Sequence, residues 1–419
     1  MPPRLSRRRA LGVLAGSVAA GAAGCAGAPV RIAVPWSGWE LARFRDVMRG
    51  YAGDPVVFSA GDSIDALLKN PVARSARPDV AFVPRLGLLG EAASGLRSMP
   101  AAIPGPSHAP GAGAWTGLLT HDGAVKGVWF KAAHKSLLWH RGRNPPPYGA
   151  GPAEPASWAA WLEYCGRAGR PLLSIGAADG WVLTDWFENV LLGIDPDTYR
   201  ALLPAPGGRG PGPGWDAPAV TQALRYLRDL WGMDGIFPGG GRRALLTSFH
   251  DSILDVFYYG HAEVVAAADF AYPVISRYGA TATVAMPCRF PAEHPGTAPV
   301  LVAGDAAVAL SDAGRGVVEW LAGDGGRAAV RDGWVREGGF ISLDSQVTGY
   351  PAALRPFAAQ VIGENVEFDL SDQLTGRLSG GNGRGLWRVL TRFFSDVTGV
   401  TSSRDPVAAA QTAMTEAAR

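Results

Sequence analysis

The sequence predicts an α/β protein with two lobes. Its 419 residues, 47% of them hydrophobic, provide enough apolar material for two packed cores. Short apolar strands alternate with segments of helical periodicity, and this alternation favours a mostly parallel sheet covered by helices.

The alternation is clearest after residue 30. Residues 31–34, 55–58 and 79–83 are predicted strands, and apolar residues recur at helical spacing after the first two. In such a sheet the ligand crevice lies beyond the carboxyl ends of the strands. The residues at or just after those ends are Trp36, Ser37, Asp62, Pro84 and Arg85. Asp62 has a second interpretation, as a helix cap.

The middle of the chain is predicted to be mainly helical. Ser157 is placed to cap a helix over 158–165, residues 183–192 form an amphipathic pattern, and 217–231 carry apolar side chains on one face. The tryptophans at apolar helical positions are predicted to be core residues: Trp158, Trp161, Trp186, Trp231 and Trp320.

The first 24 residues have the layout of an export signal, with a cationic start, an apolar run and a small-residue junction. The string Ser-Arg-Arg-Arg-Ala-Leu at 6–11 resembles a twin-arginine signal, and Gly24-Cys25 resembles a bacterial lipobox. We therefore expect cleavage before Cys25, lipidation of its sulfur, and a short tether over 25–28. The alternative is cleavage without a lipid, which would give a freely secreted protein.

The charge balance argues against two classes of partner. The formal net charge is +2, from 39 Lys and Arg against 37 Asp and Glu. Loss of the four signal arginines leaves 35 bases against 37 acids, a net charge of −2. Nucleic acids and anionic membrane surfaces need clustered positive potential, so neither is expected to bind. The lipid is then the expected membrane attachment of a monomer.

Few signals point to catalysis. The mature chain has neither a Gly-x-Ser-x-Gly motif nor a His-Glu-x-x-His motif, and its histidines have no metal-ligand spacing. We expect no metal, no cofactor and no enzyme. A glycosidase pair of carboxylates stays open, because its separation is a three-dimensional quantity. Asp179 and Asp185 are one such pair, although ligand contact and a first-turn acid are the favoured roles.

Cys165 and Cys288 are the cysteines that remain after Cys25. They can pair in an oxidising compartment or stay as buried thiols. No spacing pattern supports the pair, so two free thiols are favoured.

Beyond these separate signals, a series of segments resembles one protein family in order. They are IAVPWSG (32–38), PDVAFVP (78–84), GVWFKAAHKSLLW (127–139), PASW (155–158), SIG (174–176), GW (180–181), AGD (303–305), GGFIS (338–342) and FDLSD (368–372). The family is that of the extracellular solute-binding proteins of carbohydrate ABC importers, family 1, in the branch of maltose-type binders. The resemblance implies a type II periplasmic-binding-protein fold, with two α/β lobes that close on a ligand.

The resemblance also implies where the chain crosses between lobes, namely near 132–134, 287–290 and 336–339. We therefore expect one lobe from 29–132 plus 290–336 and the other from 133–289 plus 340–419.

A sugar binder needs flat apolar faces against pyranose C–H groups and polar side chains against hydroxyl pairs. The family's second lobe presents an acid and aromatic rings where this chain has Asp179, Trp181 and Phe270. Trp387 is a further candidate aromatic residue, and Leu386 is the alternative for the position that faces the ligand. The expected ligand-binding residues are Trp36, Ser37, Asp62, Arg85, Asp179, Trp181, Phe270, Trp334, Gly338 and Trp387.

Several of these positions have a structural alternative. Trp334 can pack at the last crossing, and Arg85 can pair with an acid of its own lobe. Asp305 is favoured as a turn or cap residue. Ala133 stands where some relatives carry a polar ligand residue, so one contact of maltose-type proteins is expected to be missing.

Three functions follow from the sequence, in order of preference. The first is a transport protein that binds a mono- to oligosaccharide between its lobes and delivers it to an ABC permease. The second is a binder of a non-sugar solute such as a glycerophosphodiester, which a cluster of bases in the cleft would favour. The third is a surface glycosidase or adhesin.

Overall fold

The computed structural model describes residues 28–69, 77–100, 112–141, 145–203, 212, 214–278, 286–363, 365–379 and 385–419. The predicted signal at 1–24 and the lipidation site Cys25 lie outside these residues.

Six strands form the sheet of the first lobe. They are β1 Arg31–Val34, β2 Val56–Ser59, β3 Val80–Val83, β6 Val128–His134, β11 Val300–Ala309 and β12 Val366–Phe368. The order is β12-β11-β3-β1-β2, with β6 also paired to β11. β1 runs parallel to β2 and β3, as predicted, whereas β11 is antiparallel to both β3 and β6.

Helices cover this sheet because their apolar stripes need burial. In α2 the buried residues are Phe44, Val47 and Met48, at helical spacing. The elements around the sheet are α2 Gly38–Met48, η1 Gly61–Ser63, α3 Ile64–Lys69, α4 Gly87–Ala92, η2 Ala93–Gly95, α5 Ala112–Leu118, the hairpin of β4 Thr120–His121 and β5 Ala124–Val125, α13 Asp312–Ala322, α14 Asp324–Val330 and the π-helical turn η5 Arg331–Val335.

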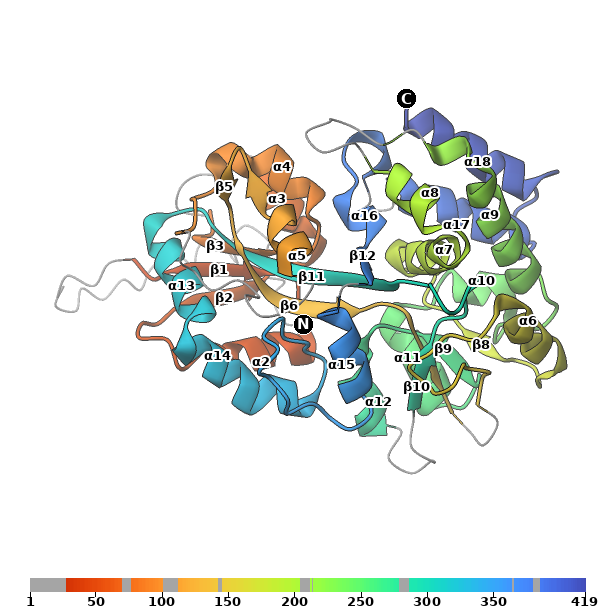
Figure 1. Cartoon of the computed structure of the whole chain (residues 1–419), viewed down its shortest axis with the longest axis horizontal. Coiled ribbons are helices and arrows are strands. Elements are labelled where there is room, and N and C mark those ends of the chain that lie inside the picture. The colour runs from red at the N-terminus through yellow and green to blue at the C-terminus, as the bar shows by residue number, and fades with distance from the viewer. Residues whose placement is uncertain are drawn as a thin grey trace, which may run out of the picture.

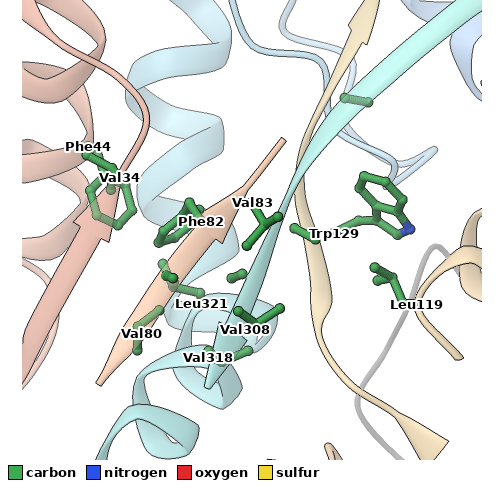
Figure 2. Packing of buried hydrophobic residues seen from close by; sticks show 14 of the residues in the cluster. Val34, Phe44, Val80, Phe82, Val83, Leu119, Trp129, Val308, Val318 and Leu321 are labelled. Carbon is green, nitrogen blue, oxygen red and sulfur yellow. The ribbon is translucent and has the colours of Figure 1, made fainter. Parts of the chain in front are cut away.

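The core of the first lobe packs on both faces of β3. All four residues of that strand are buried, which fits a strand in the interior of a sheet covered on both sides. Figure 2 shows Phe82 near Phe44 of α2, and Val80 with Val308 near the helix that carries Val318. Burial of each such side chain contributes about 1.5 to 3 kcal/mol.

The second lobe has a four-stranded sheet in the order β10-β7-β9-β8. Its strands are β7 Leu137–His140, β8 Leu173–Ser174, β9 Val264–Ala266 and β10 Met286–Arg289. Alternate residues of β7 face opposite sides, so Leu138 joins one apolar cluster while Leu137 and Trp139 join another.

The remaining helices are α6 Trp158–Arg167, α7 Gly180–Ile194, α8 Pro196–Ala201, η3 Gly214–Asp216, α9 Pro218–Trp231, α10 Gly240–Ala244, α11 Phe249–Phe257, η4 Asp269–Ala271, α12 Tyr272–Tyr278, α15 Arg355–Val361, α16 Leu370–Gln373, η6 Gly376–Leu378, α17 Gly385–Val397 and α18 Pro406–Ala417. Of these helices, α15 contacts β6 and β11 of the first sheet, and most of the others pack on the second sheet or on each other.

Two of the three helix predictions in this region are confirmed. Ser157 caps α6, since its hydroxyl accepts a hydrogen bond from the Ala160 amide at 3.2 Å, and α9 buries one face. The amphipathic prediction for 183–192 is wrong. All residues of α7 from Val182 to Gly193 are buried, because α9 and α17 pack against it within the second lobe.

The predicted core tryptophans are nearly fully buried, except Trp320, which is partly exposed. Cys165 and Cys288 are buried free thiols, as favoured, and burial raises the pKa of both to about 12. Among the described residues, no helix is both long and apolar enough to span a membrane.

Two long strands connect the lobes. In Figure 1, β6 and β11 run from the lobe at the left, with α13 and α2, toward the lobe at the right, with α7 and α9. β6 leads directly into β7, and β10 is followed by β11. Residues 340–368 also contribute side chains to the first core, and the exact lobe boundaries stay a prediction.

Candidate binding site between the two lobes

A cavity of about 240 Å³ lies where the carboxyl ends of β1 and β3 meet elements of the second lobe. Five of the predicted ligand-binding residues line it: Trp36, Arg85, Trp181, Phe270 and Trp387. The other lining residues are Pro35, Glu40, Pro84, Lys131, Ala133, Lys135, Ala303, Gly304, Asp305 and Asp372.

On the side of the first lobe, Trp36 is fixed by an aromatic cluster. Its ring centroid lies 5.0 Å from that of Phe82 and 5.5 Å from that of Trp334. Its indole nitrogen donates a hydrogen bond of 3.1 Å to Asp305 in β11. These contacts hold the ring at the cavity wall with 6% of its surface exposed.

Lys131 brings a buried ammonium to the cavity from β6. It forms an ion pair with Glu40 of α2, and its Nζ lies 5.1 Å from the ring centroid of Phe270. Burial opposes its charge, but Glu40, Asp305 and Asp269 together raise its pKa above the ordinary value. Lys131 is therefore a fixed cation shared by several acids.

Lys135 is a second buried cation, just beyond β6. Its Nζ lies 2.6 Å from Asp185 of α7 and also pairs with Asp369, the N-cap of α16. Its Nζ is 5.5 Å from the ring centroid of Trp181. Burial opposes this charge too, but the surrounding acids, Asp185 first, raise its pKa well above the ordinary value.

Arg85 follows β3 and is 7% exposed. Its guanidinium pairs with Asp65 of α3, which confirms the alternative that it meets an acid of its own lobe. It also lies 5.7 Å from the ring centroid of Trp387 on α17. The Arg85–Trp387 contact therefore joins the two lobes at the edge of the cavity.

Asp372 and Trp387 present polar atoms without protein partners. Among the described residues, no hydrogen bond or ion pair involves the Asp372 carboxyl, and the indole nitrogen of Trp387 is buried without an acceptor. Unpaired buried polar groups cost free energy, so groups of this kind at a cavity wall are suited to a ligand.

The sequence and the fold have counterparts in known proteins, although no protein-family model matches the chain. The chain is 27% identical over 362 residues to the osmoprotective compounds-binding protein GgtB of Synechocystis sp., a match that covers 78% of this chain and 80% of that protein. It is 26% identical over 409 residues to the alpha-glucosides-binding periplasmic protein AglE of Rhizobium meliloti, covering 90% and 85%. The solved maltose-maltodextrin binding protein of Alicyclobacillus acidocaldarius matches with a TM-score of 0.64 at 16% identity, over 93% of this chain and 100% of that one.

The chain is therefore similar to binding proteins over most of its length, in sequence to GgtB and AglE and in fold to the maltose-maltodextrin binding protein. Its fold is the two-lobed type II fold that the sequence resemblance implied.

Among the other predicted residues, Ser37, Asp179, Trp334 and Gly338 do not line this cavity. Ser37 is exposed at the N-cap of α2, and Asp62 lies in η1 directly before α3. Trp334 is 1% exposed and packs against Trp36, in agreement with the packing alternative. Gly338 is buried at φ +85°, a conformation that disfavours side chains.

Asp179 is used inside the second lobe. It occupies the N-cap position of α7, and its carboxylate accepts a hydrogen bond of 2.6 Å from the Phe249 amide at the start of α11. It therefore positions the neighbouring Trp181, whose ring centroid lies 4.8 Å from that of Phe249. A direct ligand contact by Asp179 stays a prediction.

The sequence interpretation missed the charged side chains of the wall. The turn or cap interpretation of Asp305 is wrong, because this residue lies within β11. Glu40, Lys131, Lys135 and Asp372 were not selected, although the two lysines lie in the crossing segment GVWFKAAHKSLLW. The presence of two lysines in such an apolar segment was the sequence signal that could have identified them as cavity residues.

Proposed function

We propose that this protein captures a carbohydrate between its lobes and delivers it to the permease of an ABC importer. The observation that carries the proposal is a single cavity lined by aromatic rings and carboxyl groups from both lobes. The named specificities of the two relatives, for osmoprotective compounds and for alpha-glucosides, support it.

The wall has the two kinds of group that sugars require. The rings of Trp36, Trp181, Phe270 and Trp387 offer faces for C–H groups of a pyranose. The carboxyl of Asp372 can accept hydrogen bonds from hydroxyl groups, and the free indole N–H of Trp387 can donate one. We propose these residues, with Arg85 and Asp305, as the ligand-binding set, supported by Ser37, Asp62, Asp179, Trp334 and Gly338 around them.

A ligand in this position stabilises a closed arrangement of the lobes. Trp36 and Asp305 belong to the first lobe, whereas Trp181 and Trp387 belong to the second. A ligand that contacts both sides binds the closed state better than the open one and shifts the population toward it.

No observation favours the other two functions. Each base that lines the cavity already has an acidic partner, and Arg336 is exposed and pairs with Asp332 at 3.6 Å. Asp179 and Asp185 are bonded to Phe249 and Lys135, so neither is available as a glycosidase carboxylate. We therefore propose no catalytic role.

We further propose that the protein works outside the cytoplasm, as a monomer held to the membrane by a lipid on Cys25 after twin-arginine export. The periplasmic relative supports an extracytoplasmic location. Membrane fractionation of the native protein and of Cys25→Ala in the producing cells tests the anchor. The variant is expected in the soluble fraction, and equal membrane retention of both proteins would contradict the lipid.

A thermal-shift screen of the purified mature domain tests the main proposal. The panel contains mono-, di- and oligosaccharides, polyols and glycerophosphodiesters. Binding to the folded state raises the melting temperature by mass action. At least one carbohydrate is expected to raise it, with glycosides left intact. No shift with any carbohydrate, or turnover of a glycoside, would contradict the proposal.

A further inference from the structure

Contacts that cross from one lobe to the other bound the cavity, and they bear on how long a ligand it accepts. Two such contacts involve residues of the cavity wall, namely Arg85 with Trp387 and Lys131 with Phe270. A contact across a cleft closes the cleft at that point, because the two side chains fill the space through which a longer ligand would extend. The length of the ligand is therefore set where these contacts lie.

The contact between Arg85 and Trp387 is held on both sides. In the first lobe, the guanidinium of Arg85 pairs with Asp65, and the Arg85 side chain is 9% exposed. In the second lobe, Trp387 packs against Gly180, where an added Cβ would lie 2.8 Å from the Cβ of Trp387. The guanidinium carbon lies 5.7 Å from the centroid of the indole ring, within the range of cation–π attraction. The pair is therefore a fixed bridge between the lobes.

The contact between the lobes continues next to this bridge. At Gly87, two residues after Arg85, an added Cβ would lie 2.6 Å from the carbonyl oxygen of Leu374 and 2.9 Å from that of Gln373. Asp372, directly before Gln373, lines the cavity. On this side of the cavity the lobes are in direct contact, which closes the path of a longer sugar chain.

The second crossing contact is made by other elements. Lys131 of β6 has its Nζ 5.1 Å from the ring centroid of Phe270 in η4, and it also pairs with Glu40 of α2. The Phe270 ring centroid lies 6.3 Å from that of Trp181. The two crossing contacts therefore bound the cavity at different places, with the wall ring of Trp181 held beside one of them.

The enclosed space agrees with a short ligand. The cavity measures about 240 Å³. Pockets that hold drug-sized ligands usually measure about 300 to 1,000 Å³. A smaller cavity suits a mono- or disaccharide better than an extended chain.

We propose that the bridge between Arg85 and Trp387 limits the ligand to about two sugar rings, so that the protein selects disaccharides against longer chains. This inference rests on the proposed function and adds the length of the carbohydrate. A longer chain can enter at this side only if Arg85 and Trp387 separate, which removes an attraction that favours the closed state.

Matched pairs of di- and trisaccharides test the limit. We would measure the binding of maltose and maltotriose, cellobiose and cellotriose, and sucrose and raffinose by calorimetry. The proteins are the wild type, Trp387→Ala, Arg85→Ala and the control Trp181→Ala. The control also removes an indole ring of the second lobe from the cavity wall, but it leaves both bridge residues in place. Melting curves verify that each variant is folded.

The disaccharide of at least one pair is expected to bind the wild type, with its trisaccharide at least about tenfold weaker. Trp387→Ala and Arg85→Ala are each expected to bring the two affinities within about threefold of each other. Trp181→Ala is expected to weaken both sugars and to leave their ratio unchanged.

Three results would overturn the inference but leave the proposed function intact. The first is a trisaccharide that binds the wild type as tightly as its disaccharide. The second is a ratio that is unchanged in both folded bridge variants, or that falls equally in Trp181→Ala. The third is binding of none of these disaccharides although the broader screen yields another carbohydrate. Failure of every carbohydrate here and in that screen would instead contradict the proposed function itself.

Discussion

At Gly87 the backbone of the first lobe meets the backbone of the second. Gly87 begins α4, whose Leu88 and Leu89 belong to the first core, whereas Leu370 and Leu374 of the facing segment belong to the second. A Cβ atom at Gly87 would lie 2.6 Å from the carbonyl oxygen of Leu374, and a carbonyl is part of the backbone and cannot rotate away. The substitution Gly87→Ala therefore tests whether this contact between the two lobes is needed for ligand binding.

The size of the effect follows from this distance. Ordinary van der Waals contacts of a Cβ atom begin at 3.4 Å. The start of α4 and Leu374, just after α16, must therefore separate by 0.8 Å to admit one methyl group. Overpacking of this kind costs about 1 to 3 kcal/mol. If the closed state alone binds sugar tightly, the dissociation constant rises by about 5- to 150-fold.

Calorimetry with the sugar selected in the screen measures this change. Gly90→Ala is the matched control, because it lies one turn later on α4 and its Cβ would be 3.6 Å from His121, an ordinary contact. The control is expected to bind as the wild type does. Equal sugar affinity of Gly87→Ala and Gly90→Ala would refute the reasoning. The contact between Gly87 and Leu374 would then not belong to the ligand-bound state.

Three further predictions concern single groups. Trp181→Ala is expected to weaken sugar binding, measured by calorimetry, by about 1 to 3 kcal/mol, because the Trp181 ring lines the cavity. The melting temperature without sugar is expected to change little, because this ring is only partly buried. Unchanged affinity would place the sugar elsewhere. Lys135→Met is expected to lower the free energy of unfolding, measured in urea, by about 3 to 5 kcal/mol, because Asp185 and Asp369 lose their buried partner. A free energy of unfolding equal to that of the wild type would contradict this, since Asp185 and Asp369 would then be uncharged in the folded state. Burial raises the pKa of Asp269 to about 7, although Lys131 opposes the shift, so the folded state holds a proton that the unfolded chain releases near pH 4. The contribution of Asp269 to stability therefore falls as the pH rises from about 4 to 7; the melting temperature of the wild type is expected to drop relative to that of Asp269→Asn over this window, and parallel curves would contradict the shift.

Much of the first lobe was predictable because its signals are local. Apolar strands and helical spacing lie within short stretches, and the rule for carboxyl ends correctly brought Trp36, Pro84 and Arg85 to one edge. The boundaries differ by a residue in places, as in β2, which begins at Val56.

The parts that were missed depend on contacts between distant segments. The partners of Lys131 and Lys135, Glu40 and Asp369, lie 91 and 234 positions away. Likewise, α7 has its polar residues Asp185 and Glu188 buried by tertiary partners, so its pattern could not reveal its central position. A periodic pattern of polar and apolar residues predicts which side chains are exposed. This prediction fails where charged side chains are buried and paired with each other.

The position of the two lysines has a consequence for how such a protein can change its specificity. Lys131 lies in β6 and Lys135 directly after it, in the segment that leads into β7 of the second lobe, so we expect a substitution at either to affect the charge of the cavity and the connection between the lobes together. The aromatic rings belong to one lobe each and can be exchanged singly. We therefore expect variants selected for a new sugar to differ first at Trp181, Phe270 and Trp387, with both lysines retained.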